Sequence, residues 1–319
     1  MINVEQIYPG FQWGNGIDKN GLHVSAIGSD LEITGLVPTY EVRDSACDLI
    51  RQYEEAAKQV VIGQERTGTQ SPDVCFANAD SDDKLIAFVR RFGPIVARCV
   101  QDTRMIPHAE LQGPRFPGRL IARQDMQELR NEQAIYRAAL VLIMHLAQRN
   151  YDYGTAQQLI KTIAANVKEW PRQWEREKSQ RDFEPMWKLS AESLKRIEGL
   201  SVAPPDPILP NEVSGRIVIC ELLNSFRSII FPNPLEMHSN IKFGTRPLLY
   251  SLLRRQFLYP RGFSICSNSE CRNFFNIERS GQQFCSSECS RHHRQRIYWQ
   301  KRGKTLRNKR TYQRRKAGK

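Results

Sequence analysis

Four cysteines near the C-terminus have a spacing that suits a metal ion. Cys266 and Cys271 are separated by four residues, Cys285 and Cys289 by three, and thirteen residues lie between the two pairs. A short gap lets both thiolates of a pair face one ion, and four thiolates suit the tetrahedral coordination of Zn²⁺. Because the four cysteines fill that shell, we expect one structural zinc ion with no open position for substrate. Redox pairing is the weaker alternative, since this segment contains no Cys-x-x-Cys.

The residues around the cysteines predict a small finger that depends on the metal. The segment Phe274 to Phe284, with a turn at Arg279-Ser280-Gly281, predicts a β-hairpin between the two pairs. The serines at 286 and 287 are candidate caps of a helix that would hold Cys289 in its first turn. A knuckle, a hairpin and a helix around one ion form a treble clef. We therefore expect zinc removal to unfold a segment of roughly 30 residues and to leave the rest of the chain intact.

The positive charge of the chain is concentrated after the second cysteine pair. The chain carries 47 Lys+Arg and 34 Asp+Glu, a net charge of +13. Thirteen basic residues and no acidic residue lie between 291 and 319, so the remainder of the chain is balanced. Such asymmetry indicates a polyanionic partner, most often nucleic acid, with a merely solvated tail as the alternative. Gly303 is expected to end the helix and to leave residues 304–319 as a basic tail.

Arginine and lysine after Cys289 could neutralise phosphates, and Tyr298 or Trp299 could stack on an exposed base. We expect at least one of these two rings to pack against the hairpin instead. His292 and His293 are expected to lie at the surface or to face phosphate, because four thiolates already complete the coordination of the metal. The residues expected to contact nucleic acid are Arg291, Arg294, Tyr298, Lys301, Arg302, Lys304, Arg307, Lys309 and Arg310.

The segment from about Tyr259 to Arg302 resembles the CGNR-type zinc finger. The shared features are the C-x4-C pair followed by aromatic residues, Arg279, the run Phe-Cys-Ser at 284–286, the C-x3-C pair and a basic helix. The name-giving Cys-Gly-Asn-Arg is replaced here by Cys-Ser-Arg-His at 289–292. In that family the finger follows a helical ABATE domain in bacterial proteins that are regarded as stress-responsive transcription regulators. The resemblance thus implies a DNA-binding regulator with an ABATE-like body.

The body itself is predicted to be mainly α-helical, with a small β-containing N-terminal part. Glycine and asparagine turns between short apolar patches predict strands or irregular structure over residues 1–40. Apolar residues at helical spacing predict helices over 44–61, 81–92, 123–148, 155–177 with a kink at Pro171, 211–230 and 247–257. The prolines between 202 and 210 predict a boundary. The expected division is a helical body over 1–203, a helical segment leading to the finger over 211–260, the zinc finger over 261–303 and the basic tail over 304–319.

Other chemically interesting residues receive structural interpretations. The cysteines outside the cluster stand among apolar neighbours, so we expect them in the core: Cys47, Cys75, Cys99 and Cys220. His145 is expected to be a hydrogen-bonded core or boundary residue. The acids for an enzyme in the body would be Asp80, Asp82 and Asp83, but they equally suit a helix N-terminus. The sequence contains no nucleophile elbow, phosphate loop or His-Glu-x-x-His, which makes an enzyme the weakest hypothesis.

The leading hypothesis is a zinc-dependent nucleic-acid-binding protein, a DNA-binding transcription regulator whose helical body senses a signal or self-associates as a homodimer. DNA is favoured over RNA; an RNA-binding protein and a protein-interaction module are the alternatives. The longest apolar run, Ala138 to Met144, is far shorter than the roughly 20 residues that span a bilayer. The start, Met1 to Gly10, carries no basic residue and does not resemble a secretory signal. We therefore expect a cytoplasmic protein with no membrane partner.

Overall fold

The structure is a computed structural model that divides into two compact units, unit 1 (Met1–Gly262) and unit 2 (Phe263–Lys319). It describes residues 11–13, 23–34, 40–42, 72–95, 98–99, 122–147, 152–179, 187–203, 212–226, 241–243, 245–258, 263–277 and 279–317. The predicted helix over 44–61 and most of the proline-rich segment lie outside these residues. Within them, no helix is both long and apolar enough to cross a membrane.

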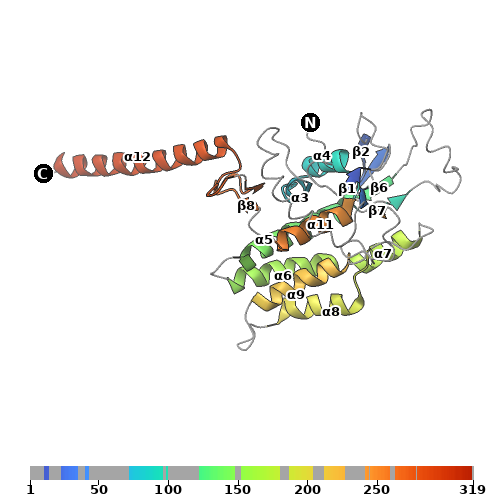
Figure 1. The fold of residues 1–319 in the computed structure, drawn as a ribbon. Helices are drawn as coiled ribbons and strands as arrows, with labels where there is room; N and C mark the ends of the chain where they lie inside the picture. The colour runs from blue at the N-terminus through green and yellow to red at the C-terminus, as the bar shows by residue number, and fades with distance from the viewer. Residues whose placement is uncertain are drawn as a thin grey trace. The chain divides into compact units, whose positions relative to one another are not determined.

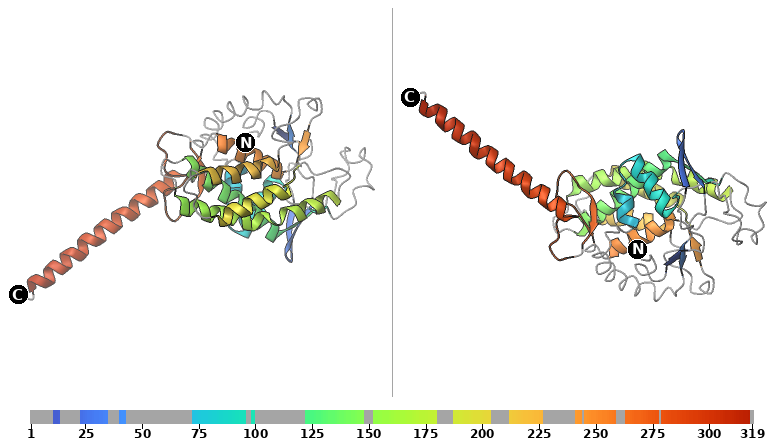
Figure 2. Two further views of the ribbon diagram at one scale, coloured as in Figure 1. Left: turned by 90° about the horizontal axis from the view of Figure 1, so that it is seen from below. Right: turned by 90° about the horizontal axis from the view of Figure 1, so that it is seen from above.

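Unit 1 is mainly helical, as predicted, and its helices surround α5. Among the described residues they are α3 (Pro72–Ala77), α4 (Asp82–Phe92), α5 (Met126–Ala147), α6 (Tyr153–Val167), α7 (Trp170–Ser179), α8 (Ala191–Val202), α9 (Glu212–Asn224) and α11 (Thr245–Leu258). Helix α5 packs against α3, α6, α9 and α11, and α6, α8 and α9 lie side by side (Figure 1). The view from above in Figure 2 shows α3 and α4 on one side of this helical layer. Apolar residues at helical spacing along α5 are buried, which makes α5 the centre of the core.

In the part of unit 1 that the structure describes, two small antiparallel sheets accompany these helices. One has the order β1 (Phe11–Trp13), β4 (Tyr40–Val42), β7 (Ile241–Phe243), and the other β2 (His23–Ile27), β3 (Asp30–Thr34), β6 (Ala122–Asp125), β5 (Arg98–Cys99). Gly28 has φ +62° in the two-residue turn between β2 and β3, a conformation that glycine adopts without strain. Leu31 and Ile33 alternate along β3 and are fully buried, so this strand presents one face to the core. The expected β-containing N-terminal part is therefore present.

Polar caps set several helix ends. Ser81 accepts a hydrogen bond from the amide of Lys84 at the start of α4, and Gly93 ends this helix with φ +90°. Asp152 caps α6 through the amides of Gly154 and Thr155. The predicted helix over 155–177 proves to be two helices, because the chain breaks after Val167 and α7 begins at Trp170. Pro171 lies in the first turn of α7, where its missing amide removes no helical hydrogen bond, so the break precedes the expected kink.

A buried ion pair stands in the aromatic core of unit 1. The guanidinium of Arg246, on α11, donates to Glu132, on α5, through Nε at 3.0 Å and Nη2 at 2.8 Å. Trp170 Nε1 donates to the same carboxylate at 3.0 Å. The guanidinium lies 4.4 Å from the ring centroid of Trp170 and 4.0 Å from that of Trp187. Since both charged side chains are 1% exposed, they stabilise the core only as a matched pair.

The division of the chain differs from the expected one. Helix α9 packs against α5, α6 and α8, and α11 packs against α3, α5 and α9. The segment 211–260, expected to lead from the body to the finger, therefore belongs to unit 1. The two units meet between Gly262 and Phe263, two residues after the expected start of the finger.

Several side chains of unit 1 lie in places that the sequence did not reveal. Cys220 is exposed and Cys75 is half-buried, so the expectation of a core position is wrong for Cys220, while the side chains of Cys47 and Cys99 lie outside the described residues. His145 Nδ1 is buried and has no hydrogen-bond partner in the described part of the chain, against the hydrogen-bonded histidine that we expected. These differences arise because burial depends on the packing of distant segments.

Two acids at the start of α4, Asp80 before the helix and Asp82 in its first turn, make ion pairs with nearby cations. Asp82 accepts from Arg130 at 2.6 Å and Asp80 from Lys84 at 2.6 Å. The hydrogen bond from Lys84 lowers the pKa of Asp80, and the one from Arg130 lowers the pKa of Asp82. A lowered pKa keeps these two carboxyl groups ionised at neutral pH. Ionised carboxylates suit a helix N-terminus, whereas a general acid must carry a proton at that pH.

Candidate metal centre and basic helix

The first cysteine pair lies in the loop of a short hairpin. Strand β8 (Phe263–Ile265) pairs with β9 (Phe274–Asn276) in antiparallel register, with Ile265 opposite Phe274. The predicted hairpin between the two cysteine pairs is therefore wrong, because Phe274 pairs with the strand before Cys266 and residues 279–284 form a turn and irregular chain. The buried rings of Phe263 and Phe274 fix this pairing, since they cover one another with centroids 6.2 Å apart.

Backbone hydrogen bonds shape the loop between these strands. Cys266 N donates to Asn273 O at 2.8 Å, and the amides of Cys271 and Arg272 both donate to Asn268 O, at 3.0 and 3.1 Å. Arg272 has φ +52°, the left-handed conformation that closes such a turn. Asn268 is 4% exposed, so the turn is folded over the Asn268 side chain. The result is a knuckle that holds both thiols of the first pair on the same side.

The second pair lies at the start of α12 (Ser287–Ala317). Ser286 Oγ accepts a hydrogen bond from Cys289 N at 3.1 Å, and its carbonyl accepts from Ser290 N at 3.2 Å. Ser286 is thus the cap of this helix and Cys289 stands in its first turn, which confirms the prediction from the serine pair. Cys285 immediately precedes the cap, so the helix start fixes the positions of both sulfurs.

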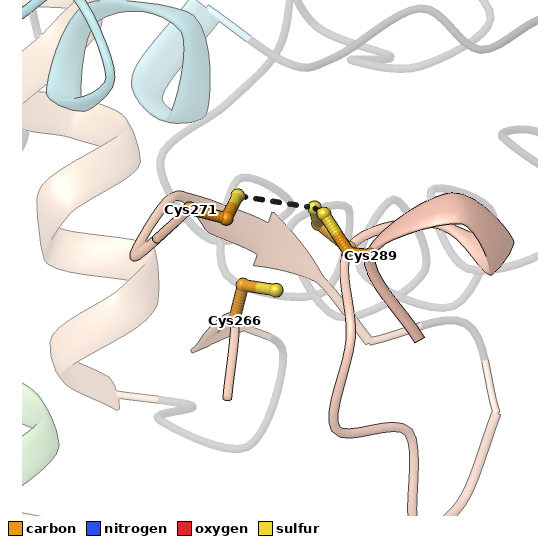
Figure 3. Close-up of side chains that lie close together, drawn as sticks. Cys266, Cys271 and Cys289 are labelled. Carbon is orange, nitrogen blue, oxygen red and sulfur yellow. Dashed lines mark hydrogen bonds between the residues drawn. The ribbon is translucent and has the colours of Figure 1, made fainter. Parts of the chain in front are cut away.

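The four predicted cysteines come together in one cluster. Their sulfur atoms all lie within 4.8 Å of one another, and Cys285 Sγ lies 3.6 Å from Cys271 Sγ and 3.5 Å from Cys289 Sγ. Figure 3 shows the thiols of Cys266, Cys271 and Cys289 directed toward a common centre. Ligands at about 2.3 Å from a tetrahedral ion lie about 3.8 Å apart, so the cluster has the size of a four-thiolate metal site. All four cysteines are free of disulfides.

The thiols of the cluster are difficult to ionise together without a cation. Burial raises the pKa of Cys271 and of Cys285, and for Cys285 the hydrogen bond with Cys289 raises it further. Burial also acts to raise the pKa of Cys289, but hydrogen bonds with Ser286 and the neighbouring thiols outweigh it and lower the pKa. A divalent cation would stabilise all four thiolates, and its binding would release protons.

The inner face of α12 packs on the finger. The ring of His293 lies 5.1 Å from that of Phe284, and its Nδ1 is 3.2 Å from Arg296 Nη2. Arg296 also pairs with Glu270, in the knuckle, at 3.5 Å. His293 is therefore a packing residue, whereas His292 is exposed and stands 3.8 Å from Glu288. These contacts join the helix to the loop that carries the first cysteine pair.

The outer face of α12 carries the residues expected to contact nucleic acid. Tyr298 and Trp299 are 55% and 61% exposed, so the expectation that one of them packs against the hairpin is wrong. The packing position is taken by His293, more than one turn nearer the cysteines. Five of the residues expected to contact nucleic acid have side chains that the structure describes, and all five are exposed: Arg291, Arg294, Tyr298, Lys301 and Arg302.

The expectation that Gly303 ends the helix is wrong. Helix α12 continues for 31 residues to Ala317 without a break (Figure 1). The sequence after residue 303 contains no proline, and eight of its sixteen residues are arginine or lysine, which favour helix, so one glycine at a cost of about 1 kcal/mol is tolerated. The expected tail is thus helical as far as Ala317, and it carries the remaining predicted residues, whose side chains lie outside the described part: Lys304, Arg307, Lys309 and Arg310.

Comparison with known proteins gives no independent assignment. No family model, no curated protein and no solved structure matches the chain. The features of this chain that bear on its function are therefore the cysteine cluster and the helix that begins at it.

Proposed function

We propose that this chain is a zinc-dependent nucleic-acid-binding protein, and that it acts as a DNA-binding transcription regulator. The observation that carries the proposal is the position of the cysteine cluster at the start of the helix that holds the excess charge. Twelve arginines and lysines and no acidic residue lie between 291 and 317. The helical unit 1 would then sense a signal or mediate self-association.

Zinc would act in this protein as a structural crosslink. Cys266 and Cys271 would hold it from the knuckle, and Cys285 and Cys289 from the start of α12, which leaves no position for a reacting water. The metal would thereby fix the direction in which α12 leaves the finger. A chelator should unfold the finger and abolish nucleic-acid binding, while the thermal unfolding of unit 1 stays unchanged. Simultaneous loss of unit 1 would contradict the assignment of the metal to unit 2 alone.

The charge and shape of α12 favour DNA as its ligand. A helix of 31 residues is about 46 Å long, and an α-helix with its side chains fits the width of the major groove of B-DNA. Contacts to phosphate provide affinity without sequence choice, and each neutralised phosphate steepens the dependence on salt. The proposal therefore predicts strong binding at low salt that weakens steeply as salt is added.

A salt titration of the full chain with a fluorescein-labelled 20-base-pair duplex tests the proposal. The variant Arg291→Gln/Arg294→Gln removes two exposed charges from α12 and should make the negative slope of log K against log salt shallower by about 1.8. The matched control, Lys161→Gln/Lys195→Gln, removes two exposed lysines from α6 and α8 and should leave the slope unchanged. Binding that is insensitive to salt, or equal effects of the two variants, would refute the proposal. An RNA of the same length, titrated in parallel, distinguishes DNA from RNA as the ligand.

A further inference from the structure

Exposed aromatic side chains interrupt the basic surface of α12. Among the described residues, the large apolar side chains that are exposed include three in a row, Ile297, Tyr298 and Trp299. The rings of Tyr298 and Trp299 are 5.5 Å apart at their centroids and inclined at 74°. Exposed apolar patches are typical of binding surfaces, and this patch is not explained by contacts to phosphate.

The surroundings of this patch are positively charged. The Arg302 guanidinium lies 5.5 Å from the ring centroid of Trp299 and 6.0 Å from that of Tyr298, and its Nη1 donates to the Tyr298 hydroxyl at 3.3 Å. Arg294 is exposed about one turn before the rings. The nearest acidic residue along α12 is Glu288, in the first turn. An occupant of this patch must therefore offer flat aromatic surface together with negative charge.

A nucleotide offers both, whereas a second copy of α12 does not. Two such helices would bring like charges together, because residues 291–317 contain no acidic side chain. The faces of bases in a closed duplex are covered by neighbouring base pairs, and only their edges are accessible in the grooves. An unpaired base exposes its face and can stack on tyrosine, tryptophan or an arginine plane.

We propose that Tyr298 and Trp299, with Arg302 beside them, form a stacking site for unpaired bases, so that α12 binds single-stranded nucleic acid in preference to closed duplex. The inference rests on the proposed nucleic-acid-binding function: duplex would still bind through phosphate contacts, and a strand with unpaired bases would bind more tightly because it adds stacking. Because the two rings are inclined at 74°, they cannot both lie parallel to one base, and each ring takes its own base. Arg302 lies close enough to both rings to neutralise the phosphate that joins the two nucleotides.

The first experiment changes the ligand and leaves the protein intact. The full chain, loaded with zinc, is titrated with labelled dT20, with an abasic 20-mer of the same charge, and with a 20-base-pair duplex. Stacking predicts at least tenfold tighter binding of dT20 than of the abasic strand, and tighter binding of dT20 than of the duplex. Equal affinities for dT20 and the abasic strand would overturn the stacking site. Titration of U20 in parallel shows whether RNA or DNA supplies the better unpaired base.

The second experiment changes the rings. Tyr298→Ala/Trp299→Ala should weaken binding of dT20 at least tenfold, with duplex affinity changed less than twofold and the salt slope preserved. The control Tyr298→Phe/Trp299→Phe keeps two aromatic faces and should retain most of the affinity. Zinc content and helical circular dichroism check that the variants remain folded. An alanine variant that binds dT20 as tightly as the unchanged protein would refute the inference.

The outcomes separate this inference from the proposed function. Failure of the unchanged protein to bind any of these nucleic acids at low salt would overturn both. Salt-dependent binding that Arg291→Gln/Arg294→Gln weakens, together with no effect of removing the rings, would leave the proposed function standing and overturn the stacking site.

Discussion

One residue of the finger, Arg272, carries backbone strain that the sequence does not reveal. Arg272 directly follows a cysteine of the cluster and has φ +52°, a conformation in which its Cβ is crowded by the backbone. A non-glycine residue in this region costs on the order of 1 kcal/mol or more. The hydrogen bond from its amide to Asn268 O, at 3.1 Å, keeps the turn closed despite this cost.

Replacement of Arg272 by glycine should therefore stabilise the knuckle. After allowance for the greater freedom of glycine in the unfolded chain, we expect a gain of about 1 kcal/mol, or zinc affinity about fivefold higher. Competition with a chromophoric chelator measures the affinity. Arg272→Ala is the control, since it removes the same side chain but keeps the Cβ, and it should leave the affinity nearly unchanged. An equal gain in both variants would show that the arginine side chain, and not its backbone, is responsible.

Residue-level prediction succeeded where the signal is local. The spacing of the four cysteines and the serine at 286 gave the cluster and the helix cap, because all the interacting atoms lie within 24 residues of sequence. The exposure of Trp299 and of Cys220 was not predicted, since apolar character alone does not say which face the rest of the chain covers. The partner of Glu132 was also beyond the sequence, because it lies on another helix.

At the scale of elements, α12 depends on the continuity of its backbone at Gly303. A Cβ added at this position would meet no atom within 4 Å, so the helix accepts alanine without a clash. Gly303→Ala should stabilise the helix by about 1 kcal/mol, whereas Gly303→Pro should cost about 3 kcal/mol and separate residues 304–317 from the first part.

Circular dichroism and duplex binding distinguish these two variants. Alanine should raise the helical signal and keep or improve affinity, whereas proline should lower both. Zinc affinity serves as the internal control and should be unchanged in both, because the last cysteine, Cys289, lies well before Gly303. An unchanged helical signal in the proline variant would contradict the continuous helix.

Elements with clear boundary residues were predicted well. Helix α4 (Asp82–Phe92) matches the range 81–92 predicted from the sequence, and the structure places it between the capping Ser81 and Gly93. The strand over Phe263–Ile265 was missed because three residues are too few to show an alternating pattern. The glycine at 303 was misinterpreted as a helix end, because an end signal is overridden where helix-favouring residues continue beyond it.

At the scale of the whole molecule, unit 1 depends on a charge pair far from its surface. Glu132→Gln keeps the shape of the side chain but leaves Arg246 buried without its counter-charge, which should cost about 3–5 kcal/mol. Urea unfolding followed by tryptophan fluorescence measures this loss, since Trp170 and Trp187 adjoin the pair.

The control for this prediction is an exposed pair in the same unit. Arg172→Gln breaks the ion pair with Glu169, in which the side chain of Arg172 is 81% exposed and that of Glu169 is 48% exposed. The loss should destabilise unit 1 by less than about 1 kcal/mol. Similar losses in the two variants would show that burial does not determine the contribution of the pair. The zinc content should remain unchanged in both.

The division between the units was the least predictable feature. The prolines after residue 202 indicated a boundary, yet α9 and α11 return to α5 and complete the core of unit 1. Whether a proline-rich connection separates two domains depends on what the following helices pack against, and their sequence does not specify that partner.

The ion pair between α5 and α11 also limits when unit 1 can fold during synthesis of the chain. Glu132 and Arg246 are separated by 114 positions, so the ribosome needs roughly 6–23 s to add the arginine after the glutamate. During that interval Arg246 has not yet been synthesised, so the carboxylate of Glu132 stays in water and the core of unit 1 around it cannot form. The four cysteines of the finger, in contrast, lie within 24 residues of sequence and emerge almost together, so the finger does not wait for a distant partner.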